Sequence, residues 1–367
     1  MLQGPTYDLI VIGGGLAGSA AAITAARSGA RVLLLESGRL PRHKVCGEFV
    51  SPESLGLLGS FLKSPLHTLV TAAPRIAESR LFLDGRVVHA PLDPPAASMA
   101  RFDLDFALLK SAAAEGVEIR TQTSAEAVSE SPAFRVSTTA GEFSAAAVVN
   151  ASGRWSKLRG TSHAPPRTKW IGLKAHFSEP GPPASVDLYF FDGGYCGVQP
   201  VKLTNEPNGN RINACAMVKA DIASNLDEVL ALHPALRERS LNWQPLSAPV
   251  STSPLIFHRP QPESGGILFA GDAACFVDPF VGDGISLALR SGALASECLL
   301  PYFRNELPLH TAASDYAHAY RERFASVFST SSTIRKILLL PRPIRRTLLG
   351  MLERTPAVKR YLIRKTR

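Results

Sequence analysis

Two kinds of hydrophobic pattern alternate along the chain, one typical of buried strands and one typical of helices. Near the N-terminus, Tyr7–Ile12 predicts a short buried strand, Leu16–Ser28 predicts an alanine-rich helix, and Arg31–Glu36 predicts a second strand. A strand, a glycine turn, a helix and a strand in this order form one βαβ unit, which implies a parallel sheet. The buried-strand pattern returns at Gly266–Ala270 and leads into a long helix over Gly284–Leu300.

The middle of the chain is richer in proline and in β-type residues. Asp84-Gly85 predicts a hairpin turn inside Arg80–Ala90, and the apolar stripe of Arg101–Glu115 predicts a helix. The other expected elements are strands at Val117–Arg120, Phe134–Thr139, Glu142–Val149, Val186–Phe191, Tyr195–Val201 and Arg211–Lys219, and one helix near Leu226–Arg239. We therefore expect the α/β class, with a β-rich domain inserted twice into a discontinuous nucleotide-binding domain.

These patterns divide the chain into three parts. We assign residues 1–74, 101–164 and 255–300 to the nucleotide-binding domain, 75–100 and 165–254 to a substrate domain, and 301–367 to a helical, basic C-terminal region. The five cysteines are odd in number and contain no C-x-x-C pair, which argues against a disulfide framework and a zinc site. Asp8 and several glycines interrupt the first apolar segment, so we expect no signal peptide and a cytoplasmic protein.

The turn after the first predicted strand reads Gly13-x-Gly15-x-x-Gly18 and opens a helix with Leu16 and Ala17. In this pattern the glycines permit a tight turn, the approach of a pyrophosphate to the backbone, and close helix–strand packing. The helix N-terminus adds unpaired N–H groups that attract phosphate. Glu36 ends the next strand, where a carboxylate accepts hydrogen bonds from ribose hydroxyls and disfavours the 2′-phosphate of NADP. We predict a dinucleotide site here; the alternative is a purely structural turn.

A second candidate cofactor-binding motif lies some 250 residues further along the chain. Gly271-Asp272 follows a predicted strand, and Gly282 and Gly284-Ile285 precede the long helix. An acid at this position can bind the ribitol of FAD, which NAD lacks, and the helix N-terminus can face the flavin ring. The alternative is a capped loop before an ordinary helix.

At this point the sequence resembles the flavoprotein superfamily of para-hydroxybenzoate hydroxylase, and within it the geranylgeranyl reductase-like branch. The motifs that carry the resemblance are GGGLAG with LLLE, MARFDLDFALL, NASGRWSKLR and GDAACFVDPFVGDGISLALRSG. The resemblance spans most of residues 7–300 and implies a GR2-type, Rossmann-like FAD-binding domain with an inserted β-sheet substrate domain and a helical C-terminus. It also implies that Gly153, in the third motif, lies at the cofactor.

The resemblance also suggests which residues take part in chemistry. PRHKVCGEFVSPES is similar to a loop that lies beside the flavin, which makes Lys44 and Cys46 cofactor contacts and Cys46 a candidate proton donor. Arg101 opens the MARFDLDFALL helix and is expected at the phosphates or the flavin edge. Tyr195, in GGYCGVQP, is the second catalytic candidate, on a strand where neighbouring side chains point to opposite faces. His43, His163 and His258 have no acid or hydroxyl partner at a spacing that would indicate catalysis, and we expect them to be solvated loop residues.

Two departures from the family patterns leave the subfamily open. Ser152 replaces the aspartate of the aromatic hydroxylases, and the chain has no Trp-x-Trp-x-Ile-Pro element, which is common in the halogenases. The resemblance favours reduction or dehydrogenation of a carbon–carbon double bond in a lipophilic polyprenyl, quinone or polyketide-like substrate. The alternatives are an NAD(P)H-dependent aromatic hydroxylase, a halogenase, and an electron-transfer flavoprotein that passes electrons to quinone. A second G-x-G-x-x-G unit is lacking, so NAD(P)H would visit transiently, or a protein or quinone partner would supply the electrons.

Positive charge is concentrated at the C-terminal end. Residues 335–367 hold eleven Lys and Arg against one acid, whereas the remainder of the chain is nearly neutral. Ile344, Leu348 and Leu352 recur every four residues, as in a basic amphipathic helix. Such a helix suits an anionic membrane surface, and the alternative is a helical cap on the body. Because no nucleic-acid module is recognisable, we expect no nucleic-acid partner.

Overall fold

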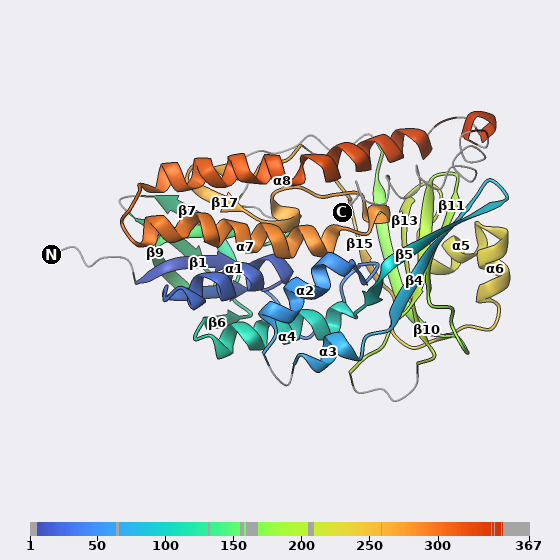
Figure 1. Cartoon of the computed structure of the whole chain (residues 1–367), viewed down its shortest axis with the longest axis horizontal. Helices are drawn as coiled ribbons and strands as arrows, with labels where there is room; N and C mark the ends of the chain where they lie inside the picture. Colours follow the sequence, from blue (N-terminus) through green and yellow to red (C-terminus); the bar gives the residue numbers. More distant parts are fainter. Residues whose placement is uncertain are drawn as a thin grey trace.

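The computed structural model describes residues 6–63, 66–130, 133–154, 158, 168–204, 209–257, 259–338, 340, 342–345 and 347. Two β-sheets lie next to each other along the long axis of the molecule (Figure 1). An eight-stranded sheet with its covering helices forms one half, and a nine-stranded sheet forms the other.

The eight-stranded sheet is built around the parallel strands β17-β9-β1-β2-β6. Its members are β1 (Tyr7–Ile12), β2 (Val32–Glu36), β6 (Glu118–Thr121), β7 (Ala125–Glu130), β8 (Phe134–Thr138), β9 (Gly141–Asn150), β16 (Glu263–Ser264) and β17 (Ile267–Phe269). Leu9 and Val11 of β1 pack into the core on one face of the sheet, and Ile10 and Ile12 pack into the core on the other. A strand covered on both faces must be apolar throughout, which is why this segment reads as a continuous hydrophobic run.

The helices of this half of the molecule pack against the sheet or against one another. They are α1 (Leu16–Arg27), α2 (Pro52–Phe61), α3 (Thr68–Thr71), α4 (Arg101–Ala114), α7 (Gly284–Phe303) and α8 (Leu309–Leu338). Helix α1 packs between the sheet and α7, and its alanine side chains are buried because both neighbours approach closely. Helix α8 runs alongside α7 (Figure 1), and the buried hydroxyl of Tyr316 on α8 donates to the carbonyl of Phe269 at 2.7 Å. The α1–α7 contact brings the N-terminal and C-terminal thirds of the chain together.

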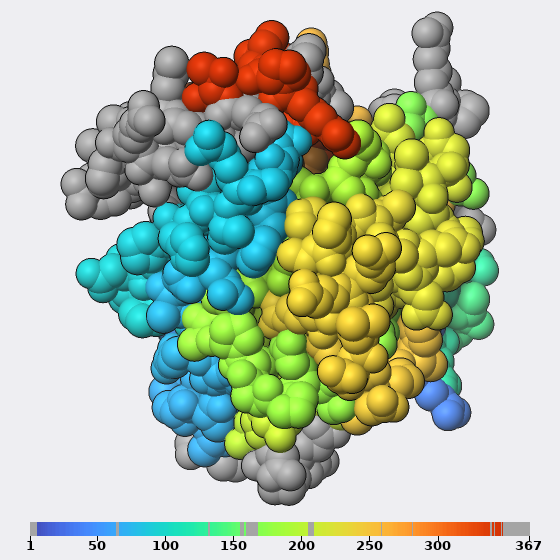
Figure 2. All heavy atoms as spheres, turned by 90° about the vertical axis from the view of Figure 1, so that its right-hand side faces the viewer, coloured from blue at the N-terminus to red at the C-terminus, as the bar shows by residue number. Residues whose placement is uncertain are grey.

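The nine-stranded sheet has the order β14-β10-β13-β12-β11-β4-β5-β3, with β15 paired to β10. Its members are β3 (Phe49–Val50), β4 (Arg75–Leu83), β5 (Arg86–Ser98), β10 (Trp170–Ser178), β11 (Ser185–Phe191), β12 (Gly194–Pro200), β13 (Arg211–Lys219), β14 (Gln244–Pro245) and β15 (Val250–Thr252). Helices α5 (Leu226–Ala231) and α6 (Pro234–Ser240) cover its outer side, where they belong to the yellow surface of Figure 2. The other face is turned toward the first half of the molecule.

Several elements differ from the sequence-based expectation. Strand β10 was not predicted, and it pairs along its whole length with β13. The single helix expected near residues 226–239 is two helices, because Pro234 begins α6 and cannot donate a hydrogen bond to α5. Phe49–Val50 joins the nine-stranded sheet through β5 and not the domain to which its neighbours were assigned.

The described part of the basic C-terminal region is helical at residues 342–345 and places Ile344 and Arg345 in different surroundings. Ile344 is 51% exposed, whereas Arg345 is buried and bonds Asp84 in the β4–β5 hairpin at 2.7 Å. Figure 2 shows the red C-terminal segment resting on the cyan hairpin. Leu348 and Leu352 lie outside the described residues. Among the helices in the described ranges, none is long and apolar enough to cross a bilayer.

Candidate cofactor and substrate site

The glycine turn between β1 and α1 forms one wall of a large cavity. Gly13 has a φ of +107°, a left-handed conformation that favours glycine. A Cβ atom added to Gly18 would lie 1.8 Å from the Gly13 carbonyl oxygen, so the turn requires glycine at that position. The Gly14 N–H donates to Glu36 Oε2 at 2.9 Å and ties the turn to the end of β2.

Two cations face the turn at Gly15. The position of a Cβ atom on this glycine lies 3.5 Å from Lys44 Nζ and 3.9 Å from a terminal nitrogen of Arg101. Asp105, which is fully buried, accepts from Arg101 Nε and Lys44 Nζ at 2.6 Å each. Burial by itself would raise the pKa of Asp105, but the charges of Arg101 and Lys44 outweigh it and lower the pKa. A helix N-terminus, an open glycine and two fixed cations together form a site for a pyrophosphate.

Glu36 lies where the sequence predicts a ribose partner. Its Oε1 atom accepts from the Gly38 N–H and from an Arg42 terminal nitrogen, both at 2.9 Å. The carboxylate lines the same cavity as the glycine turn. Oε1 uses both of its lone pairs in these bonds, whereas Oε2 accepts from the Gly14 N–H and has a second lone pair for a ribose hydroxyl.

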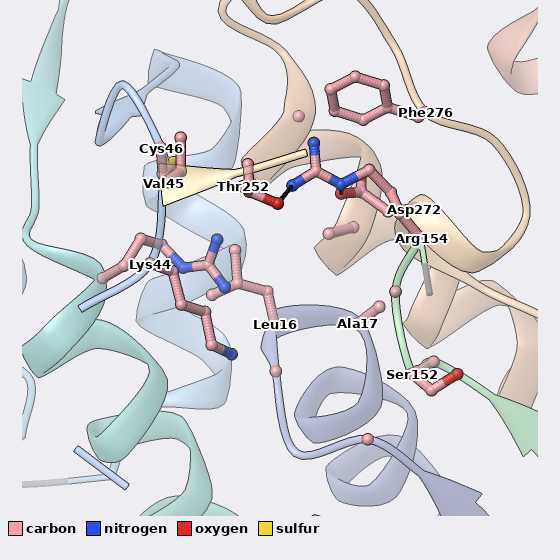
Figure 3. A pocket seen from close by; sticks show the side chains of 18 of the residues that line it. Leu16, Ala17, Lys44, Val45, Cys46, Ser152, Arg154, Thr252, Asp272 and Phe276 are labelled. Atoms are coloured by element: carbon pink, nitrogen blue, oxygen red, sulfur yellow. Dashed lines mark hydrogen bonds and ion pairs between the residues drawn. The ribbon is translucent and has the colours of Figure 1, made fainter. Parts of the chain in front are cut away.

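The opposite wall comes from the ends of β9 and β17. Ser152 and Gly153 follow β9, and Asp272 follows β17 (Figure 3). Arg154 extends between them: its Nε lies 3.8 Å from Asp272 Oδ2, and its guanidinium lies 4.4 Å from the centre of the Phe276 ring. Arg154 was not predicted as a site residue, because an arginine after a strand gives no local signal of where its long side chain points.

The N-terminus of α7 also faces this cavity. Gly282 has a φ of +74° in the turn after the short 3-10 helix Pro279–Val281, and α7 begins at Gly284. Gly282, Gly284 and Ile285 all line the cavity. Unpaired N–H groups at this helix end can stabilise negative charge on a bound ring.

The segment that contains Lys44 and Cys46 crosses from the cofactor side to the nine-stranded sheet (Figure 3). Cys46 is half-buried, and its Sγ accepts from the Glu48 N–H at 3.3 Å. His43 differs from expectation: it is no solvated loop residue but lies half-buried, with its ring centre 4.8 Å from that of Phe102 and 5.3 Å from that of His176. Burial, and then the charge of Lys174, lower the pKa of His43. His163 and His258 lie outside the described residues.

The sheet end of the cavity is more apolar. Tyr195 and Met217 contribute to it from β12 and β13, together with Phe49, Leu255 and Phe276. Cys196, the neighbour of Tyr195, packs in the core on the other face of the sheet, as the alternation of the strand predicted. Burial, followed by the charge of Asp278, raises the pKa of Tyr195 well above its ordinary value, so its hydroxyl stays protonated.

The cavity as a whole has a volume of about 1100 Å³. Apart from Gly18, which packs below the turn, it is lined by every residue that the sequence analysis proposed: Gly13, Gly15, Leu16, Ala17, Glu36, Lys44, Cys46, Arg101, Gly153, Tyr195, Gly271, Asp272, Gly282, Gly284 and Ile285. One ligand site typically measures about 300–1,000 Å³, so the space is large enough for an extended cofactor with a substrate beside it.

A continuous cavity with these walls fits the site of a flavoprotein oxidoreductase, and comparison with known proteins supports this class. A family model described as FAD dependent oxidoreductase matches residues 8–42. The chain is 26% identical to a menaquinone reductase of Mycolicibacterium smegmatis, covering 91% of this chain and 85% of that protein. It is 24% identical to digeranylgeranylglycerophospholipid reductase 2 of Methanopyrus kandleri, covering 90% and 86%. The protein is therefore an FAD-dependent oxidoreductase, and its resemblance to the geranylgeranyl reductase-like branch is confirmed.

Solved structures agree with the fold. A geranylgeranyl bacteriochlorophyll reductase-like protein from Thermoplasma acidophilum superposes with a TM-score of 0.76 at 21% identity, covering 98% of this chain and 95% of that chain. The myxobacterial chondrochloren halogenase superposes with a TM-score of 0.72 at 22% identity, covering 89% and 83%. The expected α/β class is confirmed, and one fold is common to reductases and halogenases. The chemistry must therefore be argued from the site.

Proposed function

We propose that this protein reduces a carbon–carbon double bond, or forms one by dehydrogenation, in the isoprenoid chain of a lipophilic substrate. The observation that carries the proposal is the continuity of the cavity, which runs from the phosphate-binding turn to the apolar end at Tyr195 and Met217. The similar reductases from Mycolicibacterium smegmatis and Methanopyrus kandleri are named for menaquinone and for a digeranylgeranyl lipid, both of which carry isoprenoid chains.

The residues of the first wall fit FAD. The backbone of Gly13–Gly15, with Lys44 and Arg101, would hold the pyrophosphate, and Glu36 would bind the adenosine ribose. Asp272, whose side chain is 40% exposed at the cavity, would bind the ribitol. When bound, FAD supplies the hydride-transfer chemistry, and the protein orients the substrate and handles the proton.

Cys46 and Tyr195 are the residues that we assign to the substrate side. The Cys46 thiol would donate a proton to the carbon that does not take the hydride, and in the reverse direction it would accept that proton. Tyr195, which its raised pKa keeps protonated, would orient the substrate through its hydroxyl. Met217, Leu255 and Phe276 provide the apolar contacts that exclude water from the reacting bond.

A product analysis tests this function. The FAD-bound protein is reduced without oxygen and mixed with a menaquinone of short isoprenoid chain or with a geranylgeranyl phospholipid, and the products are examined by mass spectrometry. Two added hydrogens on the isoprenoid chain support the proposal. An added oxygen or halogen atom after exposure to air would instead show a hydroxylase or a halogenase. Reduction confined to the quinone ring would show an electron-transfer flavoprotein.

We propose NAD(P)H as a transient reductant. The chain has no second glycine-rich dinucleotide motif, so a nicotinamide would have to enter the same cavity. Rapid mixing of the oxidised protein with NADH or NADPH tests this, since a competent donor bleaches the flavin absorbance. No bleaching with either would point to a protein or quinone donor.

We also propose that the segment after residue 347 contacts an anionic membrane surface. Arg335, Arg342 and Arg345 are already paired with acids of the body, at Asp278, Asp192 and Asp84. Those three arginines hold the C-terminal region on the body of the protein. A membrane contact would therefore depend on the basic residues that follow them in the sequence, among them Lys359 and Arg360. Co-sedimentation with anionic vesicles should fall on replacing Lys359 and Arg360 with glutamate. Equal sedimentation of both proteins would refute this contact.

A further inference from the structure

Glu48 occupies an unusual position between the two halves of the molecule. It lies at the end of the Cys46 segment with a φ of 62°, a left-handed conformation that is uncommon for a residue other than glycine. Its carboxylate is fully buried and accepts from Lys174 Nζ, from His176 Nε2 at 2.8 Å, and from the Arg101 N–H at 2.9 Å. A buried carboxylate with charged donors is expensive to leave unpaired, so these bonds hold the segment in one place.

The donors to Glu48 belong to an ordered patch of the nine-stranded sheet. Lys174 and His176 are alternate residues of β10 and point to the same face. His176 lies opposite Asn213 of β13, which lies opposite Gln199 of β12, so three buried polar side chains form a row across three strands.

Asn213 extends this row to the backbone of the cysteine segment. Its Nδ2 donates to the Cys46 carbonyl at 3.1 Å and to the Gly47 carbonyl at 2.9 Å. Further along the same face of β13 come Cys215 and then Met217, both of which line the cavity. The polar row is thus the direct continuation of the substrate wall.

The Cys46 sulfur is held by groups that are themselves bonded to Glu48. It accepts from the Glu48 N–H at 3.3 Å and lies within hydrogen-bonding reach of the Arg101 guanidinium. The backbone N–H of Arg101 is one of the donors to the Glu48 carboxylate. Removing the Glu48 carboxylate would therefore loosen the sulfur from both sides.

We propose that Glu48 and Asn213 are positioning residues that fix the Cys46-Gly47 turn on the substrate side of the cavity. Their importance for catalysis rests on the proposed role of Cys46 as a proton donor. Their effect on the position of the Cys46 thiol does not depend on that role, and it can be measured without any catalytic turnover. The competing explanation is that Glu48 is only an anchor between the two sheets, with no particular influence on Cys46.

The experiment measures the rate at which iodoacetamide alkylates Cys46 in the FAD-bound protein, followed on the Cys46 peptide by mass spectrometry. The variants are Glu48→Gln and Asn213→Leu, and the matched control is Asp187→Asn. Asp187 is also a buried carboxylate of the nine-stranded sheet, paired with Arg80 at 2.6 Å and with Arg239. It faces away from the cavity, because its partner across the strands, Val198, packs in the core under α5 and α6.

We expect both test variants to speed alkylation of Cys46 by about tenfold, since each removes a buried hydrogen-bonding group that holds the Cys46-Gly47 turn, and such a loss releases the half-buried thiol by that order. The control should lower the melting temperature without changing this rate. Equal rates in all four proteins, or an equal rise in the control, would overturn the proposal. If Glu48→Gln does not fold, Asn213→Leu decides, because it removes no charge. If the FAD-bound protein does not reduce the isoprenoid substrate, the proposed function is refuted. The alkylation rates of Cys46 can still be measured in that case, and they test the positioning role separately.

Discussion

Replacing Gly15 with alanine should separate cofactor binding from folding. Gly15 has φ −81° and ψ −167°, an extended conformation that alanine adopts without strain. Among the described residues, the new methyl group would meet Lys44 Nζ at 3.5 Å and Arg101 at 3.9 Å, which are ordinary contacts. The protein itself therefore has room for alanine at this position.

The substitution is expected to change the stability of the protein and its affinity for FAD in opposite directions. Without FAD, the variant should be as stable as the parent or more stable by about 0.4–1 kcal/mol, because alanine has less freedom in the unfolded chain. With FAD, the methyl group would fill the space through which a pyrophosphate approaches the backbone. A clash of that kind costs about 1–3 kcal/mol, or a Kd that is weaker by about 5- to 150-fold.

Gly18→Ala is the matched control. Its Cβ would lie 1.8 Å from the Gly13 carbonyl oxygen, so the turn must move even when no ligand is present. Urea unfolding without FAD, together with fluorescence titration with FAD, measures both properties for each variant. We expect Gly18→Ala to lose stability and affinity, and Gly15→Ala to lose affinity alone. Unchanged FAD binding in Gly15→Ala, or equal destabilisation in both variants, would refute the reasoning.

Three further predictions follow from the contacts in the cavity. Asp272→Ala should weaken FAD binding about tenfold in a titration while the unfolding free energy stays constant, and an unchanged Kd would exclude a bond to the ribitol. Asp105→Asn leaves Lys44 and Arg101 without their buried counter-ion and should cost about 3–5 kcal/mol at pH 7 in urea unfolding. Because the folded pKa of Asp105 is lowered, its stabilisation exists above the unfolded value of about 3.9 and is lost as the pH falls further, so the difference between the two proteins should shrink in acid; a constant difference would contradict this. Tyr195→Phe should raise the KM for substrate with little effect on FAD affinity, and an unchanged KM would remove Tyr195 from the substrate wall.

Local rules account for the parts of the site that were predicted. The turn at Gly13–Gly18 needs glycine for backbone reasons that involve only neighbouring residues, so its sequence pattern is visible without a structure. The alternation of β12 likewise separated Tyr195 from Cys196 correctly. The second cofactor motif, some 250 residues further along, was predicted from an acid after a strand and a glycine turn before a long helix, and in the fold β17 lies beside β9, which lies beside β1.

The buried network around Glu48 could not be predicted in the same way. Its partners Lys174 and His176 lie on β10, whose charged and polar members at alternate positions did not read as a buried strand. The only available signal was that alternation itself, Lys174-x-His176 within an otherwise apolar segment. His43 was expected in solvent for the same reason, since nothing near it in the chain reveals the contact with Phe102 and His176.

The C-terminal region shows the same division. Its excess of positive charge is a property of composition and was evident at once, but the sequence does not indicate which cations are neutralised. Tertiary structure decides this by bringing Arg335 to Asp278 and Arg345 to Asp84. The sequence by itself determined the turn, the strand periods and the cofactor class, because each depends on backbone geometry or short-range pattern. Only the tertiary structure decided the partners of buried charges, because a charge can be stabilised by any opposite group that the fold brings within a few ångströms.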